Sequence, residues 1–227
     1  MMEQGDFESR IGYAFRDRSL LLAALTHRSY SHEHSGENNQ RLEFLGDAIL
    51  DFVIADVMYR RHPDEQEGDL SKRRSRLVCE DALAHLARKL GFGEFLRLGK
   101  CEITADGGHR AGTLADAYEA VIGAIYLDGG IEPATAFIMR HHAAFLDDPG
   151  ELGAVTDAKS RLQECAQAVH KSVRYETLGR TGPEHAPTFE MAVYIDDKCI
   201  GRGTGKNKKD AQKAAAEDAL SHLDGID

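Results

Sequence analysis

The chain has 227 residues, of which 42% are hydrophobic, and a net charge of -10 at pH 7. This length and apolar fraction allow one large globular domain or two modest ones and exclude an intrinsically disordered chain. The four cysteines are widely spaced, with no CxxC pair and no cluster with histidines, which argues against a zinc site or a disulfide framework. The acidic total argues against a nucleic-acid partner for the chain as a whole, but it can hide a local basic patch.

The N-terminal segment MMEQGDFESRIGYAF is acidic, and no hydrophobic stretch of a signal peptide follows it. The longest apolar runs, such as AVIGAIYL at 120–127, are far shorter than the roughly 20 residues that span a bilayer. We therefore expect neither secretion nor membrane insertion. Together with the scattered cysteines, this predicts a cytoplasmic protein.

Apolar residues recur at spacings of three and four from about residue 7 to residue 146, which predicts an all-α domain. The expected helices are 18–27, 40–61, 69–78, 80–91, 112–128 and 131–146. In the helix at 40–61, apolar residues cover most of the circumference. This pattern predicts a helix that is buried on nearly all sides.

A different pattern follows the stretch at 148–156, which contains Pro and Gly and is predicted to be a flexible linker. Beyond it we expect a helix at 157–170, strands at 173–178, 188–195 and 198–205, and a helix at 208–223. The predicted fold is therefore an all-α domain at 1–147 followed by a small α+β domain, in the order α-β-β-β-α, at 157–227.

Two pairs of acidic residues stand on otherwise apolar helices. Glu43 and Asp47 are four residues apart, so their side chains project from one face of the helix at 40–61. Asp116 and Glu119, three apart, likewise share one face of the helix at 112–128. Carboxylates that converge in a partly buried site repel one another strongly unless cations lie between them. Either pair taken alone is more typical of a solvated helix face, and this alternative stays open on spacing alone.

Small residues beside the second pair favour convergence, because Ala120 and Gly123 lie on the same face and let another helix approach closely. Oxygen ligands without His or Cys select hard cations such as Mg²⁺, which keeps waters and substrate phosphates as its other ligands. Such a site suits phosphodiester hydrolysis. No Ser/His/Asp or Cys/His nucleophile pattern competes for this role.

The sequence around these acids resembles the ribonuclease III family. QRLEFLGD at 40–47 resembles the family signature, and EGD at 67–69 and DAYEA at 116–120 follow at the family's spacing. The resemblance spans the helical domain and implies a homodimeric, Mg²⁺-dependent endoribonuclease that cuts double-stranded RNA, with Mn²⁺ as a substitute and no small-molecule cofactor. It also implies 5′-phosphate and 3′-hydroxyl ends with short 3′ overhangs, and the processing of ribosomal RNA precursors, messenger RNA and other transcripts.

Carried over position by position, the resemblance assigns roles to single residues. The implied metal ligands are Glu43, Asp47, Asp116 and Glu119. Of these, Asp47 and Glu119 are implied to be catalytic, and the loss of Glu119 should be the most damaging. Gln40 stands where many family members have Glu. Its carbonyl can accept a hydrogen bond or orient a water molecule, but it is a weaker metal ligand than a carboxylate.

Two further positions follow from the same resemblance. Glu67 matches an acidic position that acts across the dimer, although it is equally typical of a turn residue before a helix cap at Asp69 or Ser71. Phe44 matches an aromatic residue that contacts the partner subunit, although its spacing also fits a core residue.

The second domain carries a local basic patch. Between residues 198 and 213, only Asp210 is acidic, and the basic residues are Lys198, Arg202, Lys206, Lys208, Lys209 and Lys213. The strand order and GRGTGKNKKDA at 201–211 resemble a double-stranded RNA-binding domain over about 157–225. Such a domain reads A-form shape across about 16 base pairs with little sequence preference. A lysine cluster alone is more typical of a solvated face.

Individual RNA-binding residues are implied by this second resemblance. They are Gln163, Glu164, His185, Lys208 and Lys209. Lys208 and Lys209 open a helix, where their charges add to the positive end of the helix dipole and attract phosphates. His185, in the loop GPEHAP, matches an element that enters a second minor groove. Asn207 stands where Ser is common, and we expect it to cap the last helix.

Two other functions stay open at this point. A non-catalytic dimer that binds double-stranded RNA would use the helical domain for dimerisation alone, but such a protein is expected to lose the carboxylates that this chain keeps. Another Mg²⁺-dependent all-α phosphohydrolase, acting on nucleotides, would have no use for the RNA-binding domain. The sequence therefore favours a double-strand-specific ribonuclease over both alternatives.

Overall fold

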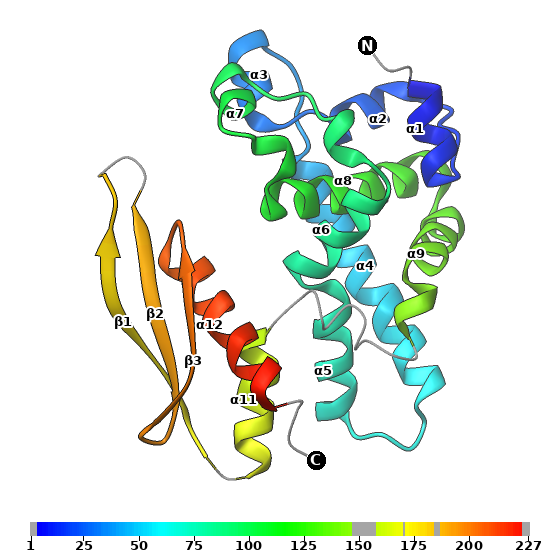
Figure 1. Cartoon of the computed structure of the whole chain (residues 1–227). Coiled ribbons are helices and arrows are strands. Elements are labelled where there is room, and N and C mark those ends of the chain that lie inside the picture. The colour runs from blue at the N-terminus through cyan, green and yellow to red at the C-terminus, as the bar shows by residue number, and fades with distance from the viewer. Residues whose placement is uncertain (1–3, 147–157, 170, 184–186, 224–227) are drawn as a thin grey trace. The chain divides into compact units, whose positions relative to one another are not determined.

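The structure is a computed structural model that describes residues 4–146, 158–169, 171–183 and 187–223 (Figure 1). The chain divides into two compact units, Met1–Leu152 and Gly153–Asp227. The linker predicted at 148–156 lies outside the described residues. Within the described ranges, no helix combines the length and the apolar character needed to cross a membrane.

Over residues 4–146 the first unit contains helices and no named strand, as predicted. Its α-helices are α1 (Gln4–Ile11), α2 (Arg18–Ala24), α3 (Arg28–His34), α4 (Gln40–Arg61), α5 (Glu67–Val78), α6 (Glu80–Lys89), α7 (Lys100–Thr104), α8 (Ala111–Gly129) and α9 (Ile131–Leu146), with short 3-10 helices η1 (Phe92–Glu94) and η2 (Gly107–His109). The predicted helix at 40–61 coincides with α4, and the other predicted helices are confirmed with small shifts of their ends. The helices α1, α3 and α7 were not predicted.

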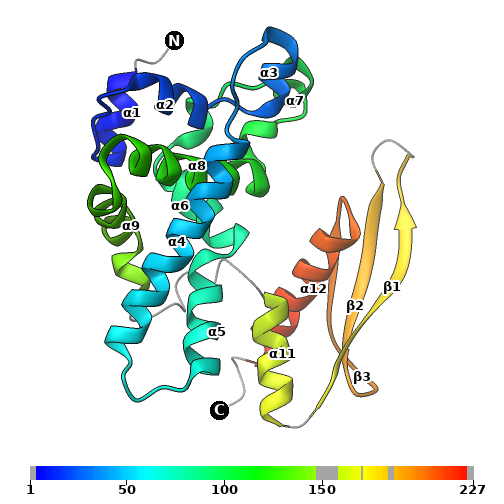
Figure 2. The same cartoon turned by 180° about the vertical axis from the view of Figure 1, so that it is seen from behind.

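Helix α8 lies at the centre of this unit, and α2, α4, α6 and α9 all pack against it (Figures 1 and 2). Small residues such as Ala117 and Ala124 let these neighbours approach, and Tyr118 and Ile122 fill the space between them with fully buried side chains. Because α8 is enclosed in this way, an acidic residue on it is held at the edge of the apolar core.

The second unit is a three-stranded antiparallel sheet with two helices on one of its faces (Figures 1 and 2). Its elements are α11 (Ala158–Ala168), β1 (Val173–Thr181), β2 (Thr188–Ile195), β3 (Lys198–Gly205) and α12 (Lys208–Leu223), paired in the order β1-β2-β3. The predicted order α-β-β-β-α is confirmed, and β1 extends further than predicted. The core joins Leu162 of α11, Val193 of β2 and Ala219 of α12.

Candidate active site

Two glycines set the distance between α4 and α8. A Cβ atom on Gly46 would overlap the carbonyl group of Glu119, and a Cβ atom on Gly123 would overlap the carbonyl oxygen of Leu42. Because neither residue has a side chain, the helix backbones touch at the turns that carry the acidic residues. This confirms the prediction that the small residues Ala120 and Gly123 let another helix approach closely.

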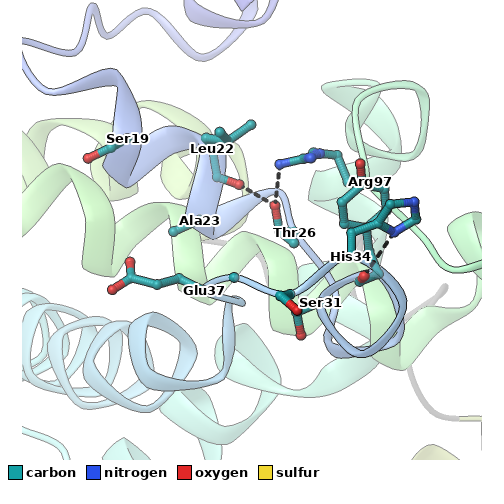
Figure 3. A pocket seen from close by; sticks show the side chains of 11 residues that line it. Ser19, Leu22, Ala23, Thr26, Ser31, His34, Glu37 and Arg97 are labelled. Atoms are coloured by element: carbon teal, nitrogen blue, oxygen red, sulfur yellow. Dashed lines mark hydrogen bonds between the residues drawn. The ribbon is translucent and has the colours of Figure 1, made fainter.

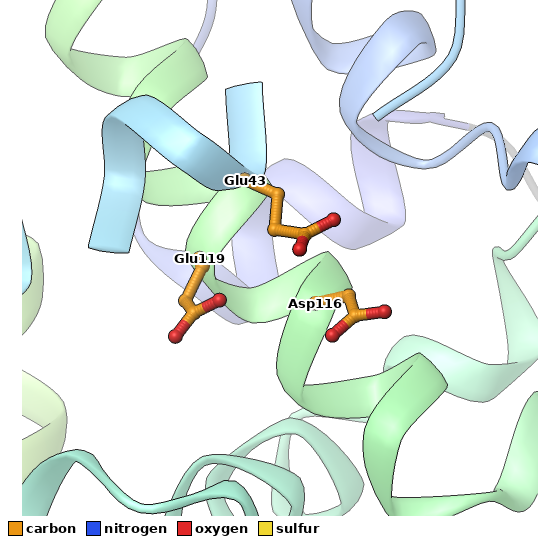
Figure 4. Close-up of side chains that lie close together, drawn as sticks. All are labelled: Glu43, Asp116 and Glu119. Atoms are coloured by element: carbon orange, nitrogen blue, oxygen red, sulfur yellow. The ribbon is translucent and has the colours of Figure 1, made fainter. Parts of the chain in front are cut away.

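Three carboxylates meet where these helices cross (Figure 4). Glu43 extends from α4, and Asp116 and Glu119 extend from neighbouring positions on α8. One oxygen from each side chain lies within 4.8 Å of the others, and all three side chains are half-buried. Oxygens that share one Mg²⁺ or Ca²⁺ ion are separated by no more than about 4–5 Å. The carboxylates are therefore close enough together for one divalent cation to bind them with modest side-chain adjustment.

Burial and neighbouring negative charges disfavour the ionised forms of the three carboxyl groups. Burial, followed by the charges of Asp47 and Glu43, raises the pKa of Glu119 to about 8. Burial also raises the pKa of Glu43, and the charge of Asp116 adds to the rise. For Asp116, burial raises the pKa while His27 opposes the rise. Carboxylates that are destabilised in this way gain from a neighbouring cation, so the donor set fits a divalent metal ion.

Asp47 and Gln40 lie on the same helix as Glu43 but outside the converging triad. Asp47 is exposed, one turn further along α4, and the structure does not place it among the three carboxylates within 4.8 Å. Its charge is nevertheless the strongest influence of any single residue on Glu119. Gln40 is exposed and lines a pocket together with Glu43. Both residues therefore stand at the rim of the cluster.

Glu67 is placed away from the cluster, in the first turn of α5. It is exposed and accepts a hydrogen bond of 2.8 Å from the hydroxyl of Ser71. Because α5 begins at Glu67 with Gln66 as its N-cap residue, the alternative of a helix cap at Asp69 or Ser71 is wrong. The helix starts earlier because its first acidic turn suits the positive end of the helix dipole.

A pocket of about 180 Å³ lies beside the carboxylates, and part of its lining was not predicted. It is lined by His27, Arg28, Asn39, Gln40, Glu43 and Asp116. No role was predicted for His27, Arg28 or Asn39. His27 lies between α2 and α3, Arg28 is the first residue of α3 and Asn39 lies just before α4, so only tertiary packing brings them to the acidic residues of α8. No spacing rule for a single helix could reveal this arrangement.

A larger hollow of about 450 Å³ lies on another part of the helical unit (Figure 3). The Arg97 guanidinium lies 4.1 Å from the centre of the Tyr30 ring and donates a hydrogen bond of 3.3 Å to Thr26. Tyr30 in turn stacks on His34, with ring centres 4.0 Å apart. None of the three converging carboxylates lines this hollow, so it is separate from the candidate metal site.

One face of α4 carries exposed aromatic residues. Phe44 is 80% exposed, Phe52 63% and Tyr59 73%, and the three lie within about 80° of one another around an ideal helix. The predictions that α4 is buried on nearly all sides and that Phe44 could be a core residue are therefore wrong for the single chain. The reason is that the neighbouring helices cover only the side that carries Leu50 and Ile54.

The predicted RNA-binding residues of the second unit are described in part. Lys208 and Lys209 are exposed in the first turn of α12, and Gln163 is exposed on α11. The side chain of Glu164 and the whole of His185 lie outside the described residues.

The start of α12 is fixed by a side-chain cap. The Asn207 side-chain oxygen accepts a hydrogen bond of 2.9 Å from the backbone N–H of Asp210, which confirms the predicted cap. The cap orients the first turn, so that the backbone N–H groups of that turn and the lysine charges face solvent together.

Comparison with known proteins covers both units. A ribonuclease-III-like family model matches residues 17–144, and a double-stranded RNA binding motif matches residues 158–223. Ribonuclease 3 of Carboxydothermus hydrogenoformans is 47% identical to this chain over 220 residues, covering 95% of this chain and 94% of that protein. Ribonuclease 3 of Caldanaerobacter subterraneus subsp. tengcongensis is 44% identical over 219 residues, covering 95% and 96%.

Among solved structures, similarity extends over the helical unit. The crystal structure of the nuclease domain of ribonuclease III from Campylobacter jejuni is 39% identical, with a TM-score of 0.60, and the match covers 64% of this chain and 97% of that one. A second structure of that domain, described for flexibility in a region involved in dimer formation, is 40% identical with a TM-score of 0.59, covering 61% and 95%.

Proposed function

Since this chain belongs to the ribonuclease III family and is an endoribonuclease that acts on double-stranded RNA, we propose that it hydrolyses the RNA backbone with Mg²⁺ bound where α4 and α8 cross. The proposed metal ligands are Glu43, Asp47, Asp116 and Glu119, and Mn²⁺ is a proposed substitute. The products carry 5′-phosphate and 3′-hydroxyl ends with short 3′ overhangs. The observation that carries this proposal is the convergence of three half-buried carboxylates within 4.8 Å.

A divalent cation, when bound, supplies Lewis-acid stabilisation of the charge on the attacking and leaving oxygens. The chain holds the ligand groups ready for it. Glu43 and Asp116 come from two helices whose separation is fixed by glycine contacts, so their geometry is set before the substrate arrives. Asp47 faces solvent at the rim, where its carboxylate can accept a hydrogen bond from the attacking water. Asp47 and Glu119 are the residues we propose as catalytic.

The second unit is proposed to hold the duplex. Lys208 and Lys209 would contact phosphates at the start of α12, and Gln163, Glu164 and His185 would contact the minor grooves. The exposed, capped first turn of α12 supports this assignment, because it aims lysine charges and backbone N–H groups at solvent. The net charge of -10 makes a local basic surface necessary for binding a polyanion.

The exposed aromatic face of α4 is proposed to pair two copies of the chain, with Phe44 as a contact residue. An unpaired apolar face of this kind is costly in water, and burying it against a second copy removes the cost. The Campylobacter jejuni nuclease domain, which is similar to this unit, has a region involved in dimer formation. Sedimentation of the wild type and of Phe44→Asp measures this directly, with a smaller species expected for the variant.

Several finer assignments belong to the same proposal. Residues 1–147 form the nuclease domain, 148–156 the linker and 157–227 the RNA-binding domain. Gln40 orients groups at the rim of the metal site, and Glu67 acts on the substrate bound by the partner subunit. The enzyme is proposed to work in the cytoplasm on ribosomal RNA precursors, messenger RNA and other structured transcripts.

Replacing one ligand separates cutting from binding. We expect Glu119→Gln to bind a labelled RNA duplex as tightly as the wild type and to cut it at least a thousandfold more slowly, because the amide is a neutral and weaker metal ligand. Gel assays of the duplex with Mg²⁺ or with EDTA measure both properties. The wild type should yield short duplex products with Mg²⁺ and only a shifted, uncut duplex with EDTA.

Two variants serve as controls for this experiment. Glu132→Gln removes an exposed carboxylate of α9 that lies outside the cluster, and it should cut like the wild type. The double variant Lys208→Ala/Lys209→Ala should show the converse defect, with weaker duplex binding and intact metal binding. Equal cleavage by Glu119→Gln and the wild type at saturating Mg²⁺ would overturn the proposed metal site.

A further inference from the structure

The pocket beside the carboxylates has two walls of opposite character. Glu43 and Asp116 form an acidic wall, whereas His27, Arg28 and Asn39 offer hydrogen-bond donors. A pocket that only held a metal ion would need acceptors on all sides, and the Arg28 guanidinium and the Asn39 amide nitrogen cannot coordinate a cation. The donor wall therefore calls for a ligand rich in acceptor oxygens.

Asn39 is the clearest sign of such a ligand. Its side chain is almost completely buried, with 2% of the residue exposed, and its Nδ2 atom has no hydrogen-bond partner among the described residues. The backbone of Asn39 is fully used, because its N–H donates to the carbonyl of Thr26 and its carbonyl accepts from the N–H of Glu43. A buried amide without a partner costs free energy, and a ligand oxygen in the pocket would remove that cost.

Arg28 adds a permanent positive charge to the same wall. Its side chain is exposed, and no ion pair or hydrogen bond of the guanidinium occurs within the described part of the chain. It lines the same pocket as Glu43 and Asp116, and its charge lowers the pKa of both carboxyl groups. A guanidinium has several N–H donors in one plane, which suits the oxygens of a phosphate group.

His27 is oriented by its neighbour so that it can donate to the pocket. The ring Nδ1 atom accepts a hydrogen bond of 3.3 Å from the backbone N–H of Ser29. In the neutral ring the proton therefore lies on Nε2, and this nitrogen is left to serve as a donor toward a ligand. The start of α4, a helix of 22 residues, lies at the same place and adds the positive end of its dipole.

The size of the pocket narrows the choice of ligand. Its volume of about 180 Å³ equals that of roughly six water molecules at about 30 Å³ each. This is enough for one phosphate group with a few waters. It is below the volume of roughly 300 Å³ at which pockets begin to enclose larger organic ligands. The pocket therefore suits a single phosphate and not a whole nucleotide.

We propose that Arg28, Asn39 and His27 bind the nonbridging oxygens of the RNA phosphate that is cleaved and then hold it as the 5′-phosphate of the product. Hydrolysis of this kind joins a water oxygen to phosphorus, breaks the bond from phosphorus to the 3′ oxygen and leaves a proton on that oxygen. A cation on the acidic wall would offset the negative charge facing the phosphate, and the donor wall would hold the oxygens that remain. The inference rests on the proposed function and adds three residues to the substrate site.

Two short RNA duplexes that differ only in carrying a 5′-phosphate or a 5′-hydroxyl test this subsite. Fluorescence anisotropy measures the binding of both duplexes to the full-length protein with Mg²⁺. The wild type should bind the 5′-phosphate duplex about tenfold more tightly, as expected for charged hydrogen bonds to one group. Arg28→Ala should reduce that preference to twofold or less, and Asn39→Asp, which replaces a donor by a negative acceptor, should do the same.

Arg41→Ala is the matched control. Arg41 is also exposed and lies in the first turn of α4, but it does not line the pocket. Arg41→Ala should change the affinity for both duplexes to the same extent, so the tenfold preference should survive. Arg28→Lys retains the charge without the planar set of donors and should keep only part of the preference. Melting curves identify a variant that fails to fold, and because Arg28 is exposed, Arg28→Ala is expected to fold even if Asn39→Asp does not.

The outcomes separate this inference from the proposed function. A wild type that cuts a long duplex with Mg²⁺ but binds the two short duplexes equally would overturn the phosphate subsite alone. The same holds if folded Arg28→Ala keeps the tenfold preference. A wild type that neither cuts the long duplex nor binds either short one would instead overturn the proposed function.

Discussion

Glycines let the backbones of α4 and α8, and those of β3 and α12, approach closely, and these two contacts bring together different chemistry. In the helical unit, Gly46 and Gly123 let the backbones of α4 and α8 touch. In the small unit, glycines of β3 let that strand touch α12, and a Cβ atom on Gly203 would overlap the backbone around Ala215. Glycine allows the close approach in both places. However, α4 and α8 carry carboxylates at their contact, whereas β3 packs against alanines of α12.

The contact of β3 with α12 stabilises the fold, whereas the contact of α4 with α8 places charged groups in a poorly solvated position. Alanines against glycines bury apolar surface without a penalty, so the contact of β3 with α12 simply completes a core. At the other contact, half-burial raises the pKa of Glu119 to about 8, chiefly through desolvation, because its charge is poorly solvated there. A close contact that costs free energy in the isolated chain is a contact that a ligand can stabilise.

The largest effect should come from Gly46→Ala, which breaks the contact of the helical unit. The new methyl group would overlap the carbonyl of Glu119, so α4 and α8 must separate. We expect the helical unit to lose roughly 1–3 kcal/mol of stability. Because displacement of a reacting group by about 1 Å can cost a hundredfold in rate, cleavage should fall by at least that factor. Melting curves with and without Mg²⁺, together with cleavage rates, measure both losses.

Gly203→Ala is the matched change in the small unit. It introduces the same methyl group at the contact of β3 with α12, and duplex affinity should fall while the increase in melting temperature caused by Mg²⁺ remains. If Gly203→Ala abolished the response to Mg²⁺ as fully as Gly46→Ala does, the two contacts would not have the separate roles assigned to them.

The sequence predicted the elements of both contacts because their patterns are long and regular. The helix at 40–61 and the strands at 188–195 and 198–205 were predicted with the bounds that the structure has. The short helices were missed for physical reasons. Helix α1 is only eight residues long, with Phe7 and Ile11 as its buried apolar pair, and α3 has no apolar periodicity and begins at a His27 cap.

The acidic residues of the site could be predicted from the sequence, but their arrangement in three dimensions could not. Spacing placed Glu43 and Asp47 on one face of α4, yet of these two only Glu43 belongs to the converging triad. The donor wall could not be predicted, since it forms when the segment after α2 pairs with Arg97, where the His27 N–H donates to the Arg97 carbonyl at 3.0 Å. Such pairing depends on contacts between segments that are distant in the sequence, so a local sequence pattern does not predict it.

A smaller effect should appear as a pH dependence confined to the helical unit. Without a divalent cation, Glu119 has a pKa of about 8 in the folded chain against its ordinary value of 4.5. Between these values the folded state keeps a proton that the unfolded state has lost, so the free energy of unfolding falls as pH rises. We expect a loss on the order of 1 kcal/mol between about pH 6.5 and pH 8 after screening by solvent, or about 2–4 °C in melting temperature.

Calorimetry in EDTA measures this slope, and Glu119→Gln is the variant that should flatten it. Burial lowers the pKa of His142 to about 4, so His142 costs stability only as pH falls below its ordinary value of 6.5. Burial lowers the pKa of His27 and of His141 in the same direction, so the chosen range separates the carboxyl cluster from these histidines. Saturating Mg²⁺ should remove most of the slope from the wild type. Identical slopes in EDTA for the wild type and Glu119→Gln would show that the cluster carries no such cost.

The smallest expected effect concerns Gln40, the exposed rim residue that lines a pocket together with Glu43. Gln40→Glu adds a third negative charge to the pocket that Glu43 and Asp116 line, and an exposed charge there changes binding of a cation by about two- to fivefold. Titration of cleavage against Mg²⁺ should shift to lower concentration by that factor, and the shift should shrink at high salt because the position is exposed. Gln66→Glu, an equally exposed change at the N-cap of α5, should leave the titration unaltered. Superimposable curves for Gln40→Glu and the wild type would leave position 40 without influence on the metal.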